Sequence, residues 1–327
     1  MWFNKRQDYL FGGELQTELT FCAVCCCPSY DKIAEGQDYL HATTHQEYSF
    51  VKCQKCEHIY LNPRPKIDEI AKIYPSSYST YNPGNIDRKS VFAMVKDTVL
   101  KNRLKLVLSH IPDSAVILDI GCGDLSLLKD LRKYTNEAHL IGLDWNFGPG
   151  LEKSAHEFGI KTITGTIETA ELPKNYCDLI IMNQLIEHVW DVEHVLSKCN
   201  TILKPGGVLS IETPNADGWD RKFFQRRSWG GYYWPRHLNI FSSSGLKTVL
   251  KDAGFEILSH HKLLAPPIWI YSLQFFLSAK GYRNLSQRLF SDKSILWLTI
   301  FTLVDLIAKI CGSTTSNQKI IVRKTKK

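Results

Sequence analysis

Short apolar runs alternate with amphipathic stretches along residues 115–263, and this alternation restricts the fold more than any other feature of the chain. The runs have the length of buried strands, and the stretches between them are long enough to hold crossover helices. Strands that alternate with helices pair in parallel, so we expect an α/β fold built on a parallel sheet. The expected strands are 116–120, 139–144, 160–164, 177–183, 207–213 and 256–262.

Two further segments extend this pattern. Residues 319–327, KIIVRKTKK, contain an apolar core that predicts one last strand returning to the sheet. Residues 90–110 place Val91, Val95 and Val99 near helical spacing, and Pro112 would end that helix. We expect it to pack against the fold and not to bind a ligand.

Composition and charge indicate an ordinary globular protein. The chain has 327 residues, enough for about two domains, and its 44% hydrophobic and 22% charged residues exclude disordered and fibrous classes. Lys and Arg exceed Asp and Glu by 40 to 33, a surplus that fits an anionic ligand, a nucleic acid, a membrane surface or a merely solvated basic face. The N-terminal residues lack a signal-peptide core, so we expect a cytoplasmic protein.

The stretch LDIGCGDLSLL, residues 118–128, predicts a ligand-binding turn between a strand and a helix. Gly121 and Gly123 let the backbone pass close to a ligand, and the helix that follows points its N–H groups toward it. A dinucleotide-binding turn would carry a third glycine where Ser126 stands. The carboxylate of Asp119 would repel a pyrophosphate but would pair well with an ammonium group.

Two later strand ends complete the expected site. Asp144, in LIGLDW, lies about 20 residues past the turn, where a carboxylate can accept hydrogen bonds from both ribose hydroxyls. The polar loop that begins at Gly165 could hold an adenine edge, and the strand at 177–183 brings Asn183 to the floor of the site. A nucleoside with a positively charged amino-acid tail fits this set, which describes S-adenosylmethionine.

Five segments in order resemble the class I S-adenosylmethionine-dependent methyltransferases, in the branch that acts on small molecules and glycans. They are DIGCG, GLDW, YCDLIIMNQLIEHV, LKPGGVLSIETPN and HLNIFSSSGLKTVLKDAGFE, and the resemblance covers residues 112–263. It implies a Rossmann-like, seven-stranded sheet whose last strand is antiparallel. Leu125 departs from the pattern, because many members carry glycine there. The cofactor-binding residues that the resemblance implies are Asp119, Gly121, Cys122, Gly123, Asp144, Trp145, Thr166, Ile167, Asn183 and Gln184.

Four of the ten cysteines form two Cys-x2-Cys pairs, Cys22 with Cys25 and Cys53 with Cys56. Two residues between thiolates allow a tight turn with both sulfurs on one side, as in tetrahedral zinc sites. The resemblance extends here, since glycan and deoxysugar methyltransferases often carry a four-cysteine zinc module followed by a segment similar to YLNPRP. Glycine usually follows each second cysteine, whereas this chain has Cys26 and Glu57. Cys26 or Cys27 could compete as ligands, and plain reduced thiols are the alternative.

Methyl transfer from a sulfonium is an in-line displacement, which requires an aligned nucleophile and, for a hydroxyl acceptor, a base. His188 is the first candidate base, with Glu187 as the residue that orients it or binds substrate, although both could merely cap the next helix. His237 is the second candidate. It lies in an aromatic and basic loop, residues 213–241, that suits a lid over a sugar, although an oligomer surface could look the same.

The segment 264–318 is unusually apolar for an insertion between two strands. Asp305 and Lys309 interrupt its second apolar run, so a spanning helix is not expected, and their spacing allows them to pair on one helical face. Three interpretations stay open: helices that cover the sheet edge and the substrate site, an interfacial helix at the inner face of a membrane, or a dimer surface.

Together these features predict a methyltransferase that acts on a hydroxyl or carbon of a sugar, a lipid-linked glycan or another small acceptor. The alternatives are an RNA methyltransferase with a zinc module and a non-catalytic zinc adaptor. NQLIEH lacks the two prolines common where nucleic-acid nitrogens are methylated, so nucleic acid is disfavoured as the partner. The expected organisation is a zinc-ribbon-like module at 1–63, a helical linker at 64–111, the core at 112–263, a helical insertion at 264–318, and the last strand with a basic tail at 319–327.

Overall fold

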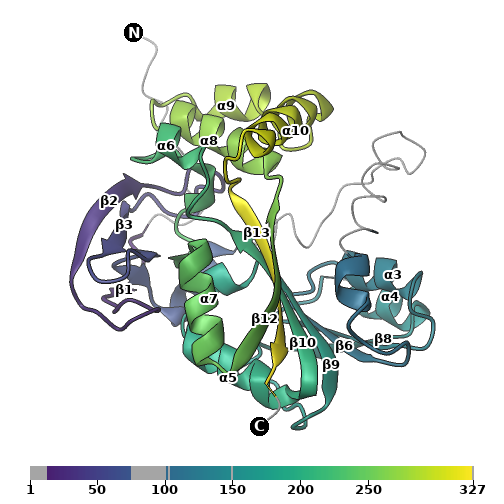
Figure 1. Ribbon diagram of the computed structural model, residues 1–327. Coiled ribbons are helices and arrows are strands. Elements are labelled where there is room, and N and C mark those ends of the chain that lie inside the picture. The colour runs from purple at the N-terminus through teal and green to yellow at the C-terminus, as the bar shows by residue number, and fades with distance from the viewer. Residues whose placement is uncertain (1–12, 75–100, 102–103, 149, 326–327) are drawn as a thin grey trace.

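The computed structural model describes residues 13–74, 101, 104–148 and 150–325 (Figure 1). Most of the helix expected at 90–110 lies outside these residues. Of that segment the structure describes only residue 101 and residues 104–110, and it places residues 104–108 in a helix.

A seven-stranded sheet forms the centre of the molecule, with the order β12-β13-β10-β9-β6-β7-β8. All neighbouring strands from β10 to β8 run parallel, whereas β13 is antiparallel to both β10 and β12. This confirms the α/β fold and the antiparallel last strand. The strands are β6 (Val116–Ile120), β7 (His139–Asp144), β8 (Ile160–Thr164), β9 (Cys177–Asn183), β10 (Leu203–Pro214), β12 (Phe255–Leu263) and β13 (Asn317–Lys324).

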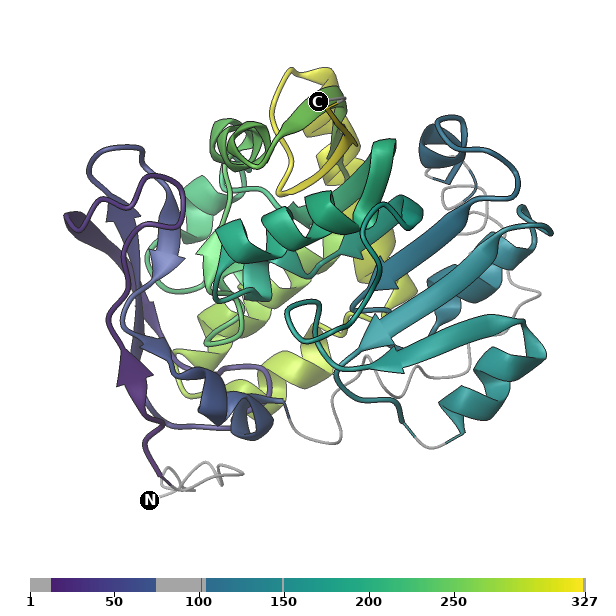
Figure 2. The same ribbon diagram turned by 90° about the horizontal axis from the view of Figure 1, so that it is seen from below.

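Helices cover both faces of this sheet because its central strands are apolar on both sides (Figure 2). In β6, Leu118 belongs to the core that packs under α5 (Val192–Ile202) and α7 (Ser243–Asp252). Its neighbour Ile117 points to the opposite core, under α3 (Ser126–Arg132) and α4 (Leu151–Glu157). Alternate residues of one strand thus fill two cores.

Strand β10 begins at Leu203, earlier than the expected start at residue 207. Leu203 pairs with Cys177, and the register then shifts before Val208 pairs with Leu179. The Pro-Gly-Gly sequence at 205–207 occupies this irregularity, which explains why it resembles a turn in the sequence.

A second, four-stranded sheet has the order β11-β4-β3-β2 and packs beside the first. Three of its strands come from the N-terminal segment, but β11 (Asn239–Ile240) comes from the segment that follows β10 and pairs with β4. The N-terminal region is thus completed by residues that follow β10. The other strands are β2 (Tyr30–Gly36), β3 (Tyr48–Cys53) and β4 (Ile59–Leu61), and a separate pair joins β1 (Thr17–Glu18) to β5 (Arg64–Pro65).

Three helices, α8 (Pro266–Ser278), α9 (Arg283–Leu289) and α10 (Ile295–Ile310), form the insertion before β13. The expected Asp305–Lys309 pair is wrong. Asp305 turns inward, where its carboxylate accepts hydrogen bonds from the Ala265 N–H at 2.6 Å and the Trp269 Nε1–H at 2.9 Å, while Lys309 is exposed. Among the described helices, none combines the length and the apolar character needed to cross a bilayer.

Candidate active site and cysteine cluster

The carboxyl ends of the parallel strands bring the predicted cofactor residues to one edge of the sheet. Asp119 precedes the end of β6, Asp144 ends β7 and Asn183 ends β9. The register pairs Ile120 with both Leu143 and Met182, so these strand ends lie at the same level. In open α/β sheets this edge is where ligands bind.

The glycine turn is held against the neighbouring strand. The Gly123 N–H donates to Asp144 Oδ2 at 2.8 Å, and the Gly121 N–H donates to the Leu143 carbonyl at 2.8 Å. Gly121 and Gly123 have φ of 72° and 52°, a region that glycine enters without steric cost. The turn therefore depends on glycine, and the hydrogen bond to Asp144 holds it in place.

Leu125 adopts the backbone conformation that favours the glycine expected at this position. Its φ of 64° is left-handed, and its side chain is fully buried against Gly142. A Cβ at Gly142 would lie 2.8 Å from Cys122 Sγ and 2.9 Å from Leu125 Cδ2. Burial of the leucine thus offsets a backbone strain of about 1–2 kcal/mol.

Two buried carboxylates dominate the electrostatics of this edge. Burial, together with the charge of Asp144, raises the pKa of Asp119 to about 8, and burial also raises the pKa of Asp144. Each carboxylate ionises more easily once a cation or hydrogen-bond donors are present. The side-chain oxygen of Asn183 is buried without a hydrogen-bond partner among the described residues. These groups fit a cationic nucleoside that donates hydrogen bonds.

The remaining predicted cofactor residues differ in burial and in the groups they contact. The Gly165 N–H donates to the Asp144 carbonyl at 2.9 Å, so the loop that follows β8 starts beside Asp144. In that loop Thr166 is exposed, whereas Ile167 is buried in the core. Gln184 directs its side-chain amide to Asn317 Oδ1 at 3.2 Å. Cys122 is buried, and Trp145 packs edge-on to Tyr74.

The structure brings all three predicted catalytic residues together. Ligand atoms of Glu187, His188 and His237 lie within 4.8 Å of one another, and the two imidazoles meet edge to face at 4.7 Å between ring centroids. Glu187 and His188 belong to η3 (Ile186–His188), directly after β9. His237 precedes β11, and the Leu238 N–H donates to the Glu187 carbonyl at 2.7 Å. The two histidines, proposed from the sequence as separate candidates, form one cluster.

A hydrogen bond fixes the tautomer of His237. The Nδ1 of His237 lies 2.8 Å from the Gly231 carbonyl and must carry the proton, which leaves Nε2 as an acceptor 4.0 Å from Glu187 Oε1. Burial raises the pKa of Glu187 to about 8 and lowers the pKa of His188 to about 4. At neutral pH the carboxyl is therefore protonated and His188 is neutral. Thr213 donates to Glu187 Oε2 at 2.8 Å, while Oε1 has no hydrogen-bond partner among the described residues.

Tyr74, which the sequence did not single out, touches this cluster. Its hydroxyl lies 2.9 Å from His188 Nδ1, and the same nitrogen lies 2.9 Å from the Arg236 carbonyl. If Nδ1 carries the proton and donates to that carbonyl, His188 Nε2 becomes the basic atom; if Tyr74 donates instead, Nε2 is protonated. Tyr74 follows α1 (Ile70–Ile73) in the segment expected to be a linker, where no motif marks it.

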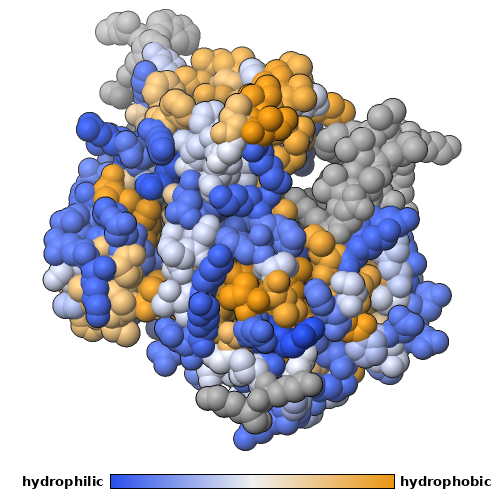
Figure 3. All heavy atoms as spheres, viewed as in Figure 1, coloured by the Kyte–Doolittle hydropathy of each residue, from blue (hydrophilic) through white to orange (hydrophobic). Residues whose placement is uncertain are grey.

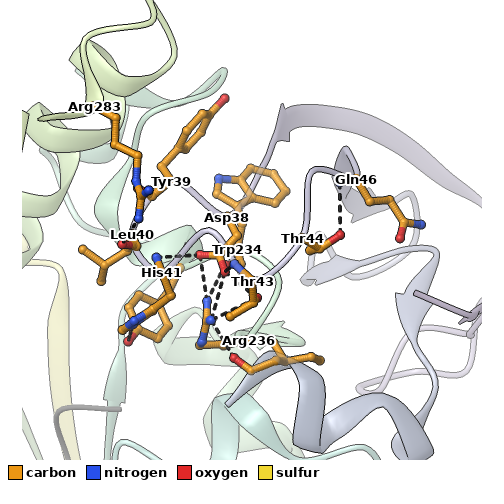
Figure 4. Close-up of polar contacts among 12 residues, drawn as sticks. Asp38, Tyr39, Leu40, His41, Thr43, Thr44, Gln46, Trp234, Arg236 and Arg283 are labelled. Atoms are coloured by element: carbon orange, nitrogen blue, oxygen red, sulfur yellow. Dashed lines mark hydrogen bonds and ion pairs between the residues drawn. The ribbon is translucent and has the colours of Figure 1, made fainter. Parts of the chain in front are cut away.

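A buried ion pair anchors the loop that carries His237 to the N-terminal region (Figure 4). The two terminal guanidinium nitrogens of Arg236, Nη1 and Nη2, donate to Asp38, each at 3.0 Å, and Nη2 also donates to the Ile73 carbonyl at 2.6 Å. Neither side chain of the ion pair is exposed. Burial alone would raise the pKa of Asp38, but the charge and hydrogen bonds of Arg236 lower it to about 2. The N-terminal region therefore positions the loop beside the cluster of Glu187, His188 and His237.

The expectation that the aromatic loop forms a lid over the acceptor is wrong for its central residues. Trp229, Tyr232 and Trp234 are at most 1% exposed, and Phe50 of β3 stacks on Tyr232 at 4.8 Å between ring centroids. Large aromatic rings contribute most when they are fully removed from water. In this protein they form a core with the four-stranded sheet and Phe275 of α8.

The four predicted zinc ligands form a second cluster, in which the two Cys-x2-Cys pairs, separate in the sequence, lie close together. The Sγ atoms of Cys22, Cys25, Cys53 and Cys56 lie within 4.8 Å of one another, with 3.4 Å between Cys22 and Cys56 and 3.5 Å between Cys25 and Cys53. Tetrahedral zinc with Zn–S distances of about 2.3 Å requires sulfurs about 3.8 Å apart. The cluster is close to that size.

Two matching turns hold these cysteines. The Cys26 N–H donates to the Cys22 carbonyl at 2.8 Å, and the Glu57 N–H donates to the Cys53 carbonyl at 3.0 Å. Cys26 and Glu57 have φ of 54° and 61°, so each adopts the left-handed conformation that favours the glycine expected there. Both turns thus have the form that the Cys-x2-Cys spacing predicts. Cys26 is exposed and stands outside the four-sulfur group.

Comparison with known proteins identifies the family. The family model described as "Methyltransferase domain" matches residues 93–260, just over half of the chain. A probable S-adenosylmethionine-dependent methyltransferase from Mycolicibacterium smegmatis is 28% identical, with 43% of this chain and 52% of that protein covered. The human mitochondrial ubiquinone biosynthesis O-methyltransferase is also 28% identical, with 44% and 47% covered.

Among solved structures, the 1,6-didemethyltoxoflavin-N1-methyltransferase of Burkholderia thailandensis is 15% identical, with a TM-score of 0.49 over 83% of this chain and 97% of that one. The chain spans about half the length of the two relatives named above. On the strength of the family match, the chain belongs to the methyltransferase domain family, among the class I S-adenosylmethionine-dependent methyltransferases.

Proposed function

We propose that the protein transfers a methyl group from S-adenosylmethionine to a hydroxyl or carbon of a sugar, a glycan or another small acceptor. The single observation that carries this proposal is the cluster of Glu187, His188 and His237 beside the end of β9. The relatives support the reaction but not one acceptor, since their names include an O-methyltransferase of ubiquinone biosynthesis and a sterol 24-C-methyltransferase.

Residues at the strand ends would hold the cofactor. Asp144 would accept hydrogen bonds from the ribose hydroxyls, Asp119 would face the ammonium group, and Asn183 Oδ1 offers a free acceptor. When bound, S-adenosylmethionine supplies an electrophilic methyl group. The turn at Gly121 and Gly123 would keep the backbone close to it.

The cluster of Glu187, His188 and His237 would orient the acceptor and receive its proton. Neutral His237 presents Nε2, and protonated Glu187 presents Oε1, so together they can orient an acceptor hydroxyl and receive its proton. The low pKa of His188, about 4, keeps its ring neutral above pH 5. If His188 is the base, methylation should therefore not be lost through its protonation near neutral pH. Positioning by Arg236 and Tyr74 would align this cluster.

Replacing His188 or His237 by alanine is expected to lower the methylation rate about 100-fold and to leave the affinity for S-adenosylmethionine within about twofold. The rate is measured with labelled S-adenosylmethionine and extracts of cell-envelope glycans. His194→Ala is the matched control, because His194 is exposed on α5. If the His188→Ala/His237→Ala double variant methylates at the wild-type rate, neither histidine is the base.

We further propose that Cys22, Cys25, Cys53 and Cys56 bind one structural zinc ion. Four thiolates complete a tetrahedral shell, so the metal would stabilise the N-terminal sheet and would have no catalytic position. Cys53→Ser is expected to abolish stoichiometric zinc and to lower the melting temperature by several degrees. Cys26→Ser, at an exposed neighbouring thiol, should keep the metal. Equal zinc content in both variants would contradict this ligand set.

A further inference from the structure

The helices α8–α10 and the segments next to them carry most of the exposed large apolar side chains of the described residues. Of 19 exposed large apolar side chains among the described residues, 11 belong to residues 264–318. Figure 3 shows this surface as the orange area over α8, α9 and α10. An apolar patch this extended commonly marks a binding surface. The 11 side chains are Phe276, Tyr282, Leu285, Leu289, Ile295, Leu296, Ile300, Leu303, Leu306, Ile307 and Ile310.

Helix α10 is apolar on two opposite faces. Its inner face packs on α8, where Phe301 stacks on Trp269 at 5.6 Å between parallel rings. Its outer face carries Leu296, Ile300, Leu303, Ile307 and Ile310, at steps of four, three, four and three residues, and Ile310 is 85% exposed. Residues at this spacing lie along one side of a helix. We call these five residues the outer stripe of α10.

A basic cavity adjoins this apolar surface. It measures about 430 Å³ between α6 (Arg221–Phe224), the loop that follows it and the end of α8, and no carboxylate lines it. The lining includes four exposed cations and two exposed aromatic rings: Lys222, Arg226, Arg227, Lys280, Phe223 and Phe276.

Few carboxylates compensate the cations of this cavity among the residues that the structure describes. Arg227 lies 3.9 Å from Glu35, a carboxylate that also pairs with Lys32, and Lys280 lies 4.3 Å over the ring of Phe276. Phe276 belongs both to the cavity and to the apolar surface, which makes the two continuous. Phe223 of α6 also lies 6.5 Å from Trp269 of α8, between ring centroids, which connects α6 to the same helical layer.

The helical insertion itself adds positive charge. Residues 264–318 contain five basic residues and two acidic ones, and the acidic Asp305 is buried. The basic residues are Lys280, Arg283, Arg288, Lys293 and Lys309.

We propose that this face docks on an anionic phospholipid membrane, with the outer stripe of α10 at the acyl boundary and a lipid phosphate in the basic cavity. Exposed apolar side chains beside lysines and arginines are the two features that bind an interfacial helix to an anionic bilayer. A second copy of the chain is a poorer occupant, because a symmetric contact would bring two sets of these cations together. The proposal goes beyond methyl transfer and does not depend on the acceptor.

The test is sedimentation of the full chain with vesicles. We expect binding to phosphatidylcholine vesicles that contain phosphatidylglycerol, weakening as salt is added, and little binding to phosphatidylcholine alone. Arg226→Ala/Arg227→Ala and Leu303→Ser/Ile307→Ser should each reduce binding at least about 10-fold. All four side chains are exposed, so these variants should keep the wild-type melting temperature. Lys153→Ala/Lys161→Ala changes the charge equally, at exposed lysines of α4 and β8, and should bind as the wild type does.

Four results would overturn the proposal. The chain could stay in the supernatant with both kinds of vesicle, or bind them with no loss in either double variant. Sedimentation velocity could instead reveal a dimer that Leu303→Ser/Ile307→Ser dissociates, which would assign the outer stripe to a second copy. If the chain binds soluble glycerol phosphate but no vesicles, the basic cavity binds small anions and not a membrane.

Discussion

Replacing Asp144 by alanine is expected to weaken the binding of S-adenosylmethionine about 1,000-fold. Two hydrogen bonds from ribose hydroxyls to a carboxylate contribute about 2 kcal/mol each, and about 4 kcal/mol corresponds to that factor. The same substitution removes the acceptor of the Gly123 N–H, which loosens the glycine turn and acts in the same direction. Isothermal titration with S-adenosylmethionine measures the loss.

The matched control is Asp130→Ala, which removes a carboxylate from α3 that pairs with Lys133 at the surface. It should bind the cofactor as the wild type does, because exposed ion pairs contribute at most about 1 kcal/mol and this one lies away from the strand ends. Circular dichroism of Asp144→Ala should retain the wild-type spectrum. Equal affinities for wild type and Asp144→Ala would place the nucleoside elsewhere.

Replacing Arg236 by methionine is expected to lower the free energy of unfolding by about 3–5 kcal/mol. The substitution leaves the Asp38 carboxylate buried and without its cation, which is the costly way to break a buried ion pair. Urea unfolding measures the change. Because the Arg236 carbonyl lies 2.9 Å from His188 Nδ1 and His237 directly follows Arg236, a displaced loop should also lower methylation.

Two further variants separate the ion pair from general packing. Arg227→Met alters an exposed arginine of the same loop and should cost at most about 1 kcal/mol. Arg236→Met/Asp38→Asn should recover part of the lost stability, because no uncompensated charge stays buried. If Arg236→Met unfolds at the wild-type urea concentration, the ion pair does not hold the loop.

The same ion pair predicts an acid limit for stability. The pKa of Asp38 is about 2 in the folded protein, below its ordinary value near 4. The folded state therefore binds this proton less readily than the unfolded state, and the contribution of Asp38 is complete above about pH 4 and disappears as the pH falls toward 2. Acid unfolding should begin at a higher pH in Asp38→Asn, which lacks this contribution.

Strands were predictable because each satisfies a local rule. The buried runs around Leu118, Ile141 and Ile180 are apolar on both faces, so their bounds follow from the sequence alone. The glycine turn was equally local, since Gly121 and Gly123 had to adopt positive φ. Even the departures at Leu125 and Glu57 kept the backbone of the glycine expected there.

Contacts between distant segments were not predictable in this way. β11 pairs with β4 across 179 positions through only two residues, too few to leave a periodic pattern. Tyr74 reaches His188 from a segment without a motif, and Arg236 finds Asp38 across 198 positions. The aromatic loop resembled a lid because composition alone cannot distinguish rings that cover a ligand from rings that fill a core, as Trp229 and Trp234 do.

The central claim is that Asp119 and Asp144 hold S-adenosylmethionine at the carboxyl edge of the large sheet. A crystal structure of the protein with S-adenosylhomocysteine tests it most directly. We predict the ribose hydroxyls within hydrogen-bond distance of Asp144 and the amino-acid portion beside Asp119 and the glycine turn. A nucleoside bound elsewhere, or none bound at saturating concentration, would contradict the account.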